Sequence, residues 1–290
     1  MRGATPFVLL MVAACGEFRD LPADAAPRPD ARPAAPGACK RGVAYNREQA
    51  ADAPAFQLGI GWWYDWSAVP EAGAAQALAA AGIEFVPMVF TAPPRADIDV
   101  DALIADIPAG AHYLLGFNEP NFGVQANLTP AQAAAAWPKL EAIAAARGLE
   151  LVSPALNYCG GDCNETDPFV WLDAFFAACT GCKVDYVAFH WYACSRDALT
   201  YILGRFESYG RPVWLTEFAC LDSPDKSVPA QQAYMKQAVP LLETDPKVFR
   251  YAWFIGRSFP GADPDNLFGA PGALTTLGED YIGFDGRCIP

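Results

Sequence analysis

Two glutamates come directly after strand-like apolar runs. Glu119 lies in the segment GFNEPN and Glu217 in the segment WLTEF. A single glutamate in such a place is most often a helix cap or a loop ion pair, because a buried carboxylate needs compensating partners. Two of them, beside Asn118 and several aromatic residues, favour catalysis. Glycoside hydrolysis uses such a pair, since one carboxyl group protonates the leaving oxygen and the other attacks the sugar.

The chain contains two histidines, His112 and His190, which argues against a histidine-rich metal centre. His190 ends a strand-like run. One interpretation is a buried, hydrogen-bonded histidine of the core. The other is a side chain that orients Glu217 or binds a sugar hydroxyl, and the strand-end position favours this second interpretation.

Aromatic residues are abundant, with 8 Trp, 18 Phe and 11 Tyr, and such side chains suit stacking on sugar rings as well as core packing. We expect Trp253, at the end of the last strand-like run, to form a platform beneath the sugar at the cleavage point. Trp62 and Trp66 are expected to serve neighbouring subsites. Because neighbouring strand residues face opposite sides, Trp62 and Trp63 cannot both face the site.

Eight apolar runs alternate with helix-like stretches. The expected strands are 41–45, 58–63, 84–90, 112–118, 149–154, 184–190, 212–217 and 249–254. Apolar strands that alternate with helices predict parallel pairing with both faces buried. Eight such units in roughly 250 residues predict an α/β fold, the (β/α)8 TIM barrel, with the active site at the carboxyl ends of the strands. The alternative, an open doubly wound sheet, lacks the expected glycine-rich phosphate loop.

The composition excludes several classes of protein and partner. A chain with 53% hydrophobic and 18% charged residues is not disordered. Its formal net charge of -13 disfavours nucleic acid and anionic membrane surfaces as partners. Nothing in the sequence indicates an oligomer, and we expect a monomer.

The N-terminal segment predicts export. Residues 1–14 place a short apolar run after one positive charge, which is typical of a signal peptide and too short to span a membrane. The run ends in VAAC, which is similar to a bacterial lipobox and predicts a lipid on Cys15, with anchoring at the cell envelope or surface; an ordinary signal peptide is the alternative. Residues 15–38 are rich in Pro, Ala and Asp and predict a disordered linker. Residues 39–290 are expected to form one catalytic domain.

Eight cysteines remain besides Cys15, and an even number in an exported chain predicts disulfides. Connectivity does not follow from the sequence alone. We predict the pairs Cys159–Cys163, Cys179–Cys182, Cys194–Cys220 and Cys39–Cys288. The last pair would join the two ends of the domain.

An ordered series of motifs resembles glycoside hydrolase family 128, the Asl1-like glycosyl hydrolases within the large clan of retaining (β/α)8 glycosidases. The resemblance covers about Cys39 to Trp253, nearly all of the folded part. The motifs are KRGVAY, WWYDW, FVPM, LGFNEPN, HWY, WLTE and YAWF.

The resemblance implies a retaining endo-β-1,3-glucanase. Glu119 would be the general acid/base, Glu217 the nucleophile and Asn118 a hydrogen-bond partner of the sugar 2-hydroxyl, and in the wider clan a tyrosine near Tyr192 hydrogen-bonds the nucleophile. Double displacement of this kind needs no metal or cofactor. Asp65 departs from the Asn expected in its motif, and a charge there would alter substrate preference.

We therefore expect a secreted hydrolase of β-1,3-glucan polysaccharide or oligosaccharides. Two alternatives remain. One is a non-catalytic surface protein that binds glycans, although binding alone requires neither glutamate. The other is a retaining hydrolase of a different β-glycan, because one barrel fold hosts many substrates.

Overall fold

Eight parallel strands form a single curled sheet with helices around it. The computed structural model describes residues 39–258 and 263–284. The strands are β1 (Arg41–Ala44), β2 (Trp62–Tyr64), β3 (Glu84–Phe85), β4 (Tyr113–Leu115), β5 (Glu150–Leu156), β6 (Tyr186–Trp191), β7 (Val213–Phe218) and β8 (Val248–Phe254). Their order in the sheet is β3-β2-β1-β8-β7-β6-β5-β4.

The two edge strands meet and close the sheet into a barrel. Met88, just beyond β3, forms a parallel bridge with Leu115 of β4. The backbone amide of Leu115 donates to the carbonyl of Pro87 at 2.9 Å, and that of Val89 donates to the carbonyl of Leu115 at 3.0 Å. Pro87 has no N–H to add to the ladder, so the regular strand is shorter than the predicted 84–90. The predicted (β/α)8 barrel is confirmed.

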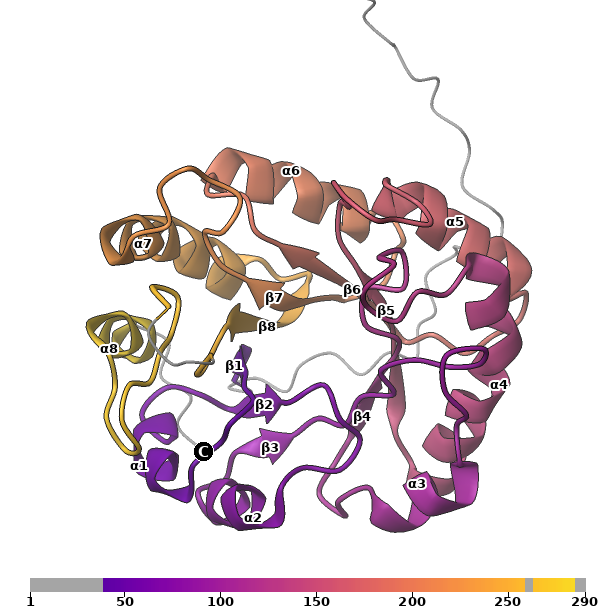
Figure 1. Ribbon diagram of the computed structural model, residues 1–290, viewed down its shortest axis with the longest axis horizontal. Coiled ribbons are helices and arrows are strands. Elements are labelled where there is room, and N and C mark those ends of the chain that lie inside the picture. Colours follow the sequence, from indigo (N-terminus) through magenta and orange to yellow (C-terminus); the bar gives the residue numbers. More distant parts are fainter. Residues whose placement is uncertain (1–38, 259–262, 285–290) are drawn as a thin grey trace, which may run out of the picture.

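Helices surround the barrel (Figure 1). They are α1 (Ala53–Phe56, after the 3-10 turn Ala50–Asp52), α2 (Ala72–Ala80), α3 (Val100–Asp106), α4 (Pro130–Arg147), α5 (Pro168–Ala178), α6 (Arg196–Glu207), α7 (Val228–Thr244) and α8 (Thr276–Gly283). In the part of the chain that the structure describes, no helix is long and apolar enough to cross a membrane.

Helix α4 shows how local signals in the sequence set the two ends of an element. Thr129 is its N-cap, accepting from the backbone amide of Gln132, while the Gln132 side chain accepts from the amide of Thr129, and Pro130 occupies the first turn. Gly148 ends the helix at φ 69°, in the left-handed region that glycine adopts without strain. These signals lie within a few residues of one another, so the sequence alone reveals them.

Two apolar layers hold the fold together. One fills the barrel interior and is rich in aromatic rings, including those of Trp62, Tyr64 and Trp214. The other lies between the sheet and the helices and contains Trp63 and Trp253. The alternation of Trp62 and Trp63 between the two layers follows from the two-residue period of a strand.

Three of the predicted disulfides are present: Cys159–Cys163, Cys179–Cys182 and Cys194–Cys220. Cys288 lies outside the described residues, so the pair Cys39–Cys288 stays a prediction. Cys15 and the linker 15–38 also lie outside them.

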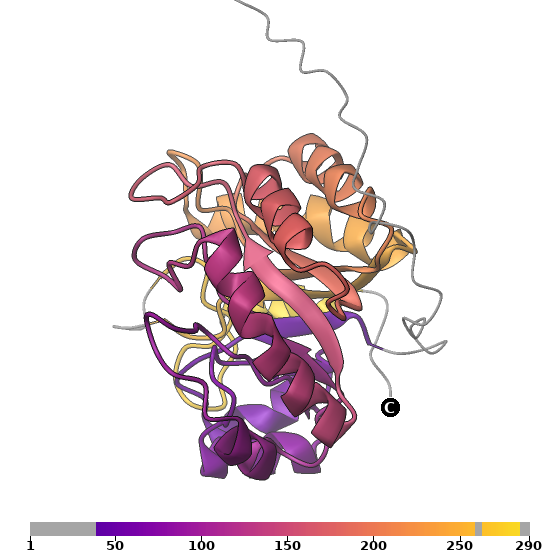
Figure 2. The same ribbon diagram turned by 90° about the vertical axis from the view of Figure 1, so that its right-hand side faces the viewer.

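In Figure 2 the β5 arrow points toward the end of the barrel where the long connecting loops extend. The candidate site lies at this end.

Candidate active site

Glu119 follows β4 at the mouth of the barrel. Its backbone has φ 39°, an uncommon conformation for a residue other than glycine. The backbone amide of Glu119 donates to the carbonyl of Ala155 at 2.9 Å, which ties the turn to β5. The residue is only 7% exposed, so its carboxylate lies in the floor of the site rather than in solvent.

Glu217 lies on β7, and an irregularity in the sheet directs it into the mouth. Phe189 of β6 is opposite Leu215, but His190 is opposite Glu217, so β7 has one extra residue, Thr216. A bulge of this kind redirects side chains. Leu215 and Phe218 both pack in the outer layer. Thr216 and Glu217, which lie between them, can therefore face the barrel interior.

Hydrogen-bond donors surround the Glu217 carboxylate. The indole nitrogen of Trp66 donates to Oε1 at 2.7 Å, and the Tyr64 hydroxyl lies 3.1 Å from the same oxygen. The Tyr192 hydroxyl donates to Oε2 through a short hydrogen bond. The predicted contact between Tyr192 and Glu217 is therefore present, and the three donors stabilise the ionised form of the carboxylate.

His190 lies between the two carboxylates. Its Nδ1 is 2.9 Å from Oε1 of Glu119 and 3.4 Å from Oε2 of Glu217. A proton on Nδ1 thus faces both oxygens, while Nε2 is buried without a hydrogen-bond partner among the described residues. Burial by itself lowers the pKa of His190, but the charges of Glu217 and Glu119 outweigh it and the net pKa is raised. His190 is thus buried and hydrogen-bonded, as in the first interpretation, and its contact with Glu217 is the one that the orienting role requires.

The ionisation of the site follows from burial and charge. Burial raises the pKa of Glu217, the charge of His190 opposes that rise, and the charge of Glu119 adds to it. Hydrogen bonds from Tyr192 and Trp66 also oppose the rise, but the net pKa of Glu217 stays above its ordinary value. Burial also raises the pKa values of Tyr64 and Tyr192 well above that of free tyrosine, so both phenols stay protonated and act as donors.

Glu119, His190 and Glu217 are also spaced as metal ligands often are, with one ligand atom of each within 4.8 Å of the others. Both oxygens of Glu217 are already occupied, however. Oε1 faces the donors of Trp66 and Tyr64, and Oε2 faces those of Tyr192 and His190. A cation would have to displace these donors, so the arrangement suits an ionised carboxylate held by hydrogen bonds better than a metal ligand.

Asn118 precedes Glu119 and is 3% exposed. Its Nδ2 donates weakly to Oε1 of Gln125 at 3.4 Å, whereas its buried Oδ1 has no partner among the residues that the structure describes. A buried acceptor without a partner is costly. A sugar hydroxyl that enters the site can donate to this oxygen. The contact between Asn118 and the 2-hydroxyl stays a prediction.

An open cleft of about 1180 Å³ lies over these residues. This exceeds the ~300–1,000 Å³ of a typical small-molecule pocket and suits a chain of several sugars. Its aromatic lining consists of Trp66, Phe90, Phe122, Tyr158, Trp191, Tyr192 and Phe254. The charged lining side chains are the acids Glu119, Asp167, Glu217 and Asp222, and none is basic among the described residues.

The predictions for Trp62 and Trp253 as sugar platforms are wrong. Both side chains are completely buried. The ring of Trp62 faces the barrel interior but lies too deep, covering Gly42 and donating to the carbonyl of Lys40 at the opposite end of β1. Trp253 faces the helices instead, 4.9 Å from the ring of Phe218, and donates to the carbonyl of Asp265.

Trp66 does reach the cleft, as predicted, but further aromatic residues that line it, Phe254 among them, were missed. Tyr64 was missed as well; it is buried and donates to Glu217. It lies two residues after Trp62 on the same face of β2, so the two-residue strand period is the signal that would have identified it. Phe254 lines the cleft in place of Trp253, with its ring 6.0 Å from that of Trp66 and 5.6 Å from that of Tyr192. No local signal distinguishes Phe254 from Trp253.

Asp65 acts within its own turn. Its Oδ1 accepts from the backbone amide of Ser67 at 3.0 Å and from the Ser67 hydroxyl at 2.7 Å, and the turn holds Trp66 at φ 62°. The side chain does not line the cleft. Burial raises the pKa of the neighbouring Glu48 to about 7, and the Asp65 carboxylate adds to that shift. Asp65 thus affects the site through the position of Trp66.

Replacing Tyr192 with Phe removes a donor that lowers the pKa of Glu217. If Glu217 is the nucleophile, it must be ionised to react, and its pKa then sets the acidic limb of the pH–rate profile. We expect that limb to move to higher pH and the rate at its optimum to fall by about 10²-fold, as for other preorganised donors. Rates from pH 4 to 9 test this, with Tyr201→Phe as the exposed control. An unchanged acidic limb would contradict it.

Comparisons with known proteins agree with this geometry. The family model described as "Glycosyl hydrolase catalytic core" matches residues 42–281. The alkali-sensitive linkage protein 1 of Schizosaccharomyces pombe is 30% identical over 234 residues, which are 77% of this chain and 40% of that protein. The chain therefore spans about two fifths of the length of this curated relative.

This chain matches solved structures of similar proteins over nearly the whole length of those proteins. A GH128 subgroup II endo-β-1,3-glucanase from Sorangium cellulosum is 43% identical, with a TM-score of 0.79 over 84% of this chain and 98% of that one. A subgroup I endo-β-1,3-glucanase from Amycolatopsis mediterranei, solved with laminaritriose, is 30% identical, with a TM-score of 0.67 over 84% of this chain and 98% of that one.

Proposed function

The chain belongs to the glycosyl hydrolase catalytic core family, in the GH128 group of its solved relatives, and from that premise we propose that it is a retaining endo-β-1,3-glucanase. One observation carries the proposal: two buried carboxylates, Glu119 and Glu217, bring an oxygen of each within 4.8 Å in the floor of an open cleft. Carboxyl groups lie ~5–5.5 Å apart in retaining glycosidases and ~6.5–9.5 Å apart in inverting ones, which must admit a water between them. The short separation therefore supports retention.

The first half of the proposed reaction forms a glycosyl-enzyme. Ionised Glu217 attacks the anomeric carbon and forms a C–O bond, while the glycosidic C–O bond breaks. Protonated Glu119 gives its proton to the departing oxygen, so the leaving sugar departs as a neutral alcohol. The donors from Trp66, Tyr64 and Tyr192 hold Glu217 in one orientation, which preorganises the attack.

The second half returns the enzyme to its starting state. Glu119, now ionised, takes a proton from a water molecule, and the water oxygen attacks the anomeric carbon from the side that the leaving group vacated. The bond to Glu217 breaks and its carboxylate is restored. His190 Nδ1, facing both carboxylates, stabilises negative charge on Glu119 after the first proton transfer and on Glu217 after the second.

The substrate assignment rests on similarity and on the cleft. The solved relatives named as endo-β-1,3-glucanases are up to 43% identical to this chain and match it over 98% of their length. The acidic lining of the cleft favours a neutral glycan, because an anionic polysaccharide would be repelled by the carboxylates of Asp167, Glu217 and Asp222.

Proton NMR during hydrolysis tests the proposal. We expect linear β-1,3-glucan to yield oligosaccharides of several lengths whose new reducing ends appear first as the β-anomer, before mutarotation. β-1,4-Glucan is the matched control and should remain intact. First appearance of the α-anomer would contradict retention, and products from β-1,4-glucan alone would contradict the linkage. Binding of the polymer without any products would indicate a non-catalytic glycan-binding protein.

A further inference from the structure

The loop between β5 and α5 forms one wall of the cleft and is closed on itself by a disulfide. We call residues 157–167 the stapled loop; the disulfide Cys159–Cys163 lies within it, and the backbone amide of Cys159 donates to the carbonyl of Thr166 at 3.1 Å. Asn157, Tyr158, Cys159, Gly160, Thr166 and Asp167 line the cleft. The mechanism above uses none of these residues.

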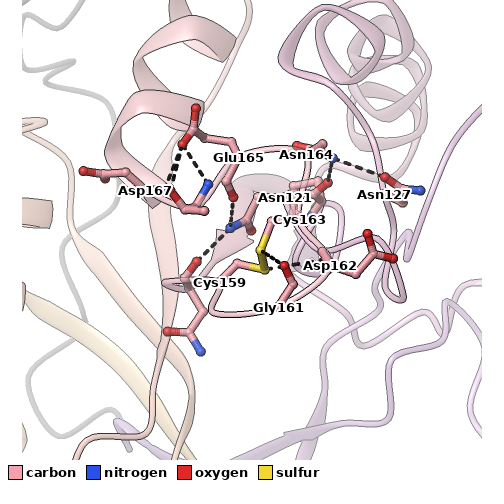
Figure 3. Close-up of a disulfide and its surroundings, with 12 residues drawn as sticks. Asn121, Asn127, Cys159, Gly161, Asp162, Cys163, Asn164, Glu165 and Asp167 are labelled. Carbon is pink, nitrogen blue, oxygen red and sulfur yellow. Dashed lines mark hydrogen bonds between the residues drawn. A yellow bond between two sulfur atoms is a disulfide. The ribbon is translucent and has the colours of Figure 1, made fainter.

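The stapled loop is bound firmly to the segment that follows Glu119 (Figure 3). Asn121 is completely buried, and its Nδ2 donates to the carbonyls of Asn157 at 2.8 Å and Glu165 at 3.2 Å. Asn164 donates in the other direction, from Nδ2 to the carbonyl of Pro120 at 2.7 Å. Because these bonds cross in both directions, the loop holds a fixed position relative to Glu119.

The backbones of the two segments are also paired directly. Phe122 and Cys163 form an antiparallel bridge, and the amide of Gly123 donates to the carbonyl of Asp162 at 2.8 Å. This backbone packing, together with the disulfide, gives the cleft a rigid wall at this side.

Tyr158 is the exposed aromatic surface of that wall. Its side chain is 42% exposed. Its ring lies 6.4 Å from that of Trp191, which also lines the cleft, and 6.3 Å from that of Phe169 at the start of α5. These two contacts support the ring of Tyr158 from the protein side, and an aromatic face is complementary to the C–H face of a pyranose.

The position of the loop indicates which part of the substrate it meets. Glu119 protonates the oxygen that leaves, so the departing sugars lie beyond Glu119. The stapled loop is joined to the residues directly after Glu119 and lines the cleft next to them. Trp66 follows β2 and Phe254 ends β8, and the two rings contact each other on strands that are not neighbours of β5.

We propose that Tyr158, together with Trp191, forms a binding subsite for a neutral glucosyl unit on the leaving-group side of the cleaved bond, held in place by the stapled loop. The inference rests on the proposed retaining function. In a retaining enzyme the leaving-group side also binds the acceptor that attacks the glycosyl-enzyme. Tyr158 therefore affects acceptor sugars more strongly than it affects the donor half of the substrate.

Transfer to an added acceptor tests the subsite. The donor is an aryl glycoside of β-1,3-glucobiose, whose leaving group is not a sugar, and the acceptor is free β-1,3-glucobiose. We expect Tyr158→Ala to lower the ratio of transfer to hydrolysis by about tenfold, a loss typical of one aromatic stacking contact. Tyr158→Phe keeps the ring and should restore the ratio. Leu58→Ala removes an apolar side chain that is 62% exposed and does not line the cleft, so it should leave the ratio unchanged.

The outcomes separate this inference from the proposed function. Equal losses of transfer and of aryl glycoside hydrolysis in Tyr158→Ala would overturn the subsite and assign Tyr158 a structural role. An unchanged ratio would also overturn it. If the unmodified chain cleaves neither the aryl glycoside nor β-1,3-glucan, the proposed function itself fails and the subsite with it. The double variant Cys159→Ser with Cys163→Ser should lower the same ratio, because it releases the loop that carries Tyr158.

Discussion

Replacing Glu217 with Gln is expected to lower the rate of β-1,3-glucan hydrolysis by about 10⁴-fold or more, a loss typical of removing a catalytic nucleophile. The amide has the size of the carboxylate but carries no charge and is a poor nucleophile. It also places an NH₂ group among side chains that donate hydrogen bonds, namely Trp66, Tyr64 and Tyr192. Initial rates of reducing-end release measure the effect.

Two controls make this result specific to the nucleophile. Glu207→Gln changes a carboxylate at the end of α6 that pairs with Lys247 far from the cleft, and it should retain activity. Thermal unfolding should show that the Glu217 variant is folded.

A rescue experiment tests the same assignment. In Glu217→Gly, added azide should attack the anomeric carbon of an activated aryl β-glycoside and give the α-glycosyl azide. A variant that retains more than about a hundredth of the activity would exclude Glu217 as the nucleophile.

Replacing Glu119 with Gln is expected to slow glucan hydrolysis by about 10²–10⁴-fold, the usual contribution of general acid catalysis. The size of the loss depends on the leaving group. An alcohol leaves slowly without a proton, whereas dinitrophenolate leaves readily without one. With a dinitrophenyl glycoside the first step should therefore stay fast, while the second step slows because no base activates water.

This imbalance has a kinetic signature. The Glu119 variant should release a burst of dinitrophenol close to one equivalent of enzyme, followed by slow turnover, and the glycosyl-enzyme should accumulate and be visible by mass spectrometry. Azide should speed the second step, since it attacks without needing a base. Equal losses on the glucan and on the activated glycoside would assign Glu119 a positioning role and leave the acid/base unidentified.

His190 links these two predictions. Its Nδ1 contacts one oxygen of each carboxylate. Burial lowers the pKa of His190 and raises the pKa of Glu217, and the charge of each residue opposes the effect of burial on the other. His190 and Glu217 therefore titrate together rather than as independent residues. The pH–rate profiles of the Glu119 and Glu217 variants should differ from that of the unmodified chain on both limbs.

The sequence by itself determined the eight strands, the barrel and the ends of strands at which the glutamates lie. The capping box at Thr129 and the glycine at position 148 mark the ends of α4. The two-residue period assigned Trp62 and Trp63 to opposite faces. These features depend on residues within a few positions of one another, and such local patterns are legible without a structure.

The tertiary structure alone decided which side chains reach the cleft. The depth of Trp62 depends on how the strands tilt and stagger around the barrel, and the side chosen by Trp253 depends on the helices that cover β8. The extra residue Thr216, which turns Glu217 inward, appears only when β7 is paired with β6. Asn121 meets Asn157 across 36 positions in the chain. Such contacts join segments with no local relation, so no short pattern in the sequence records them.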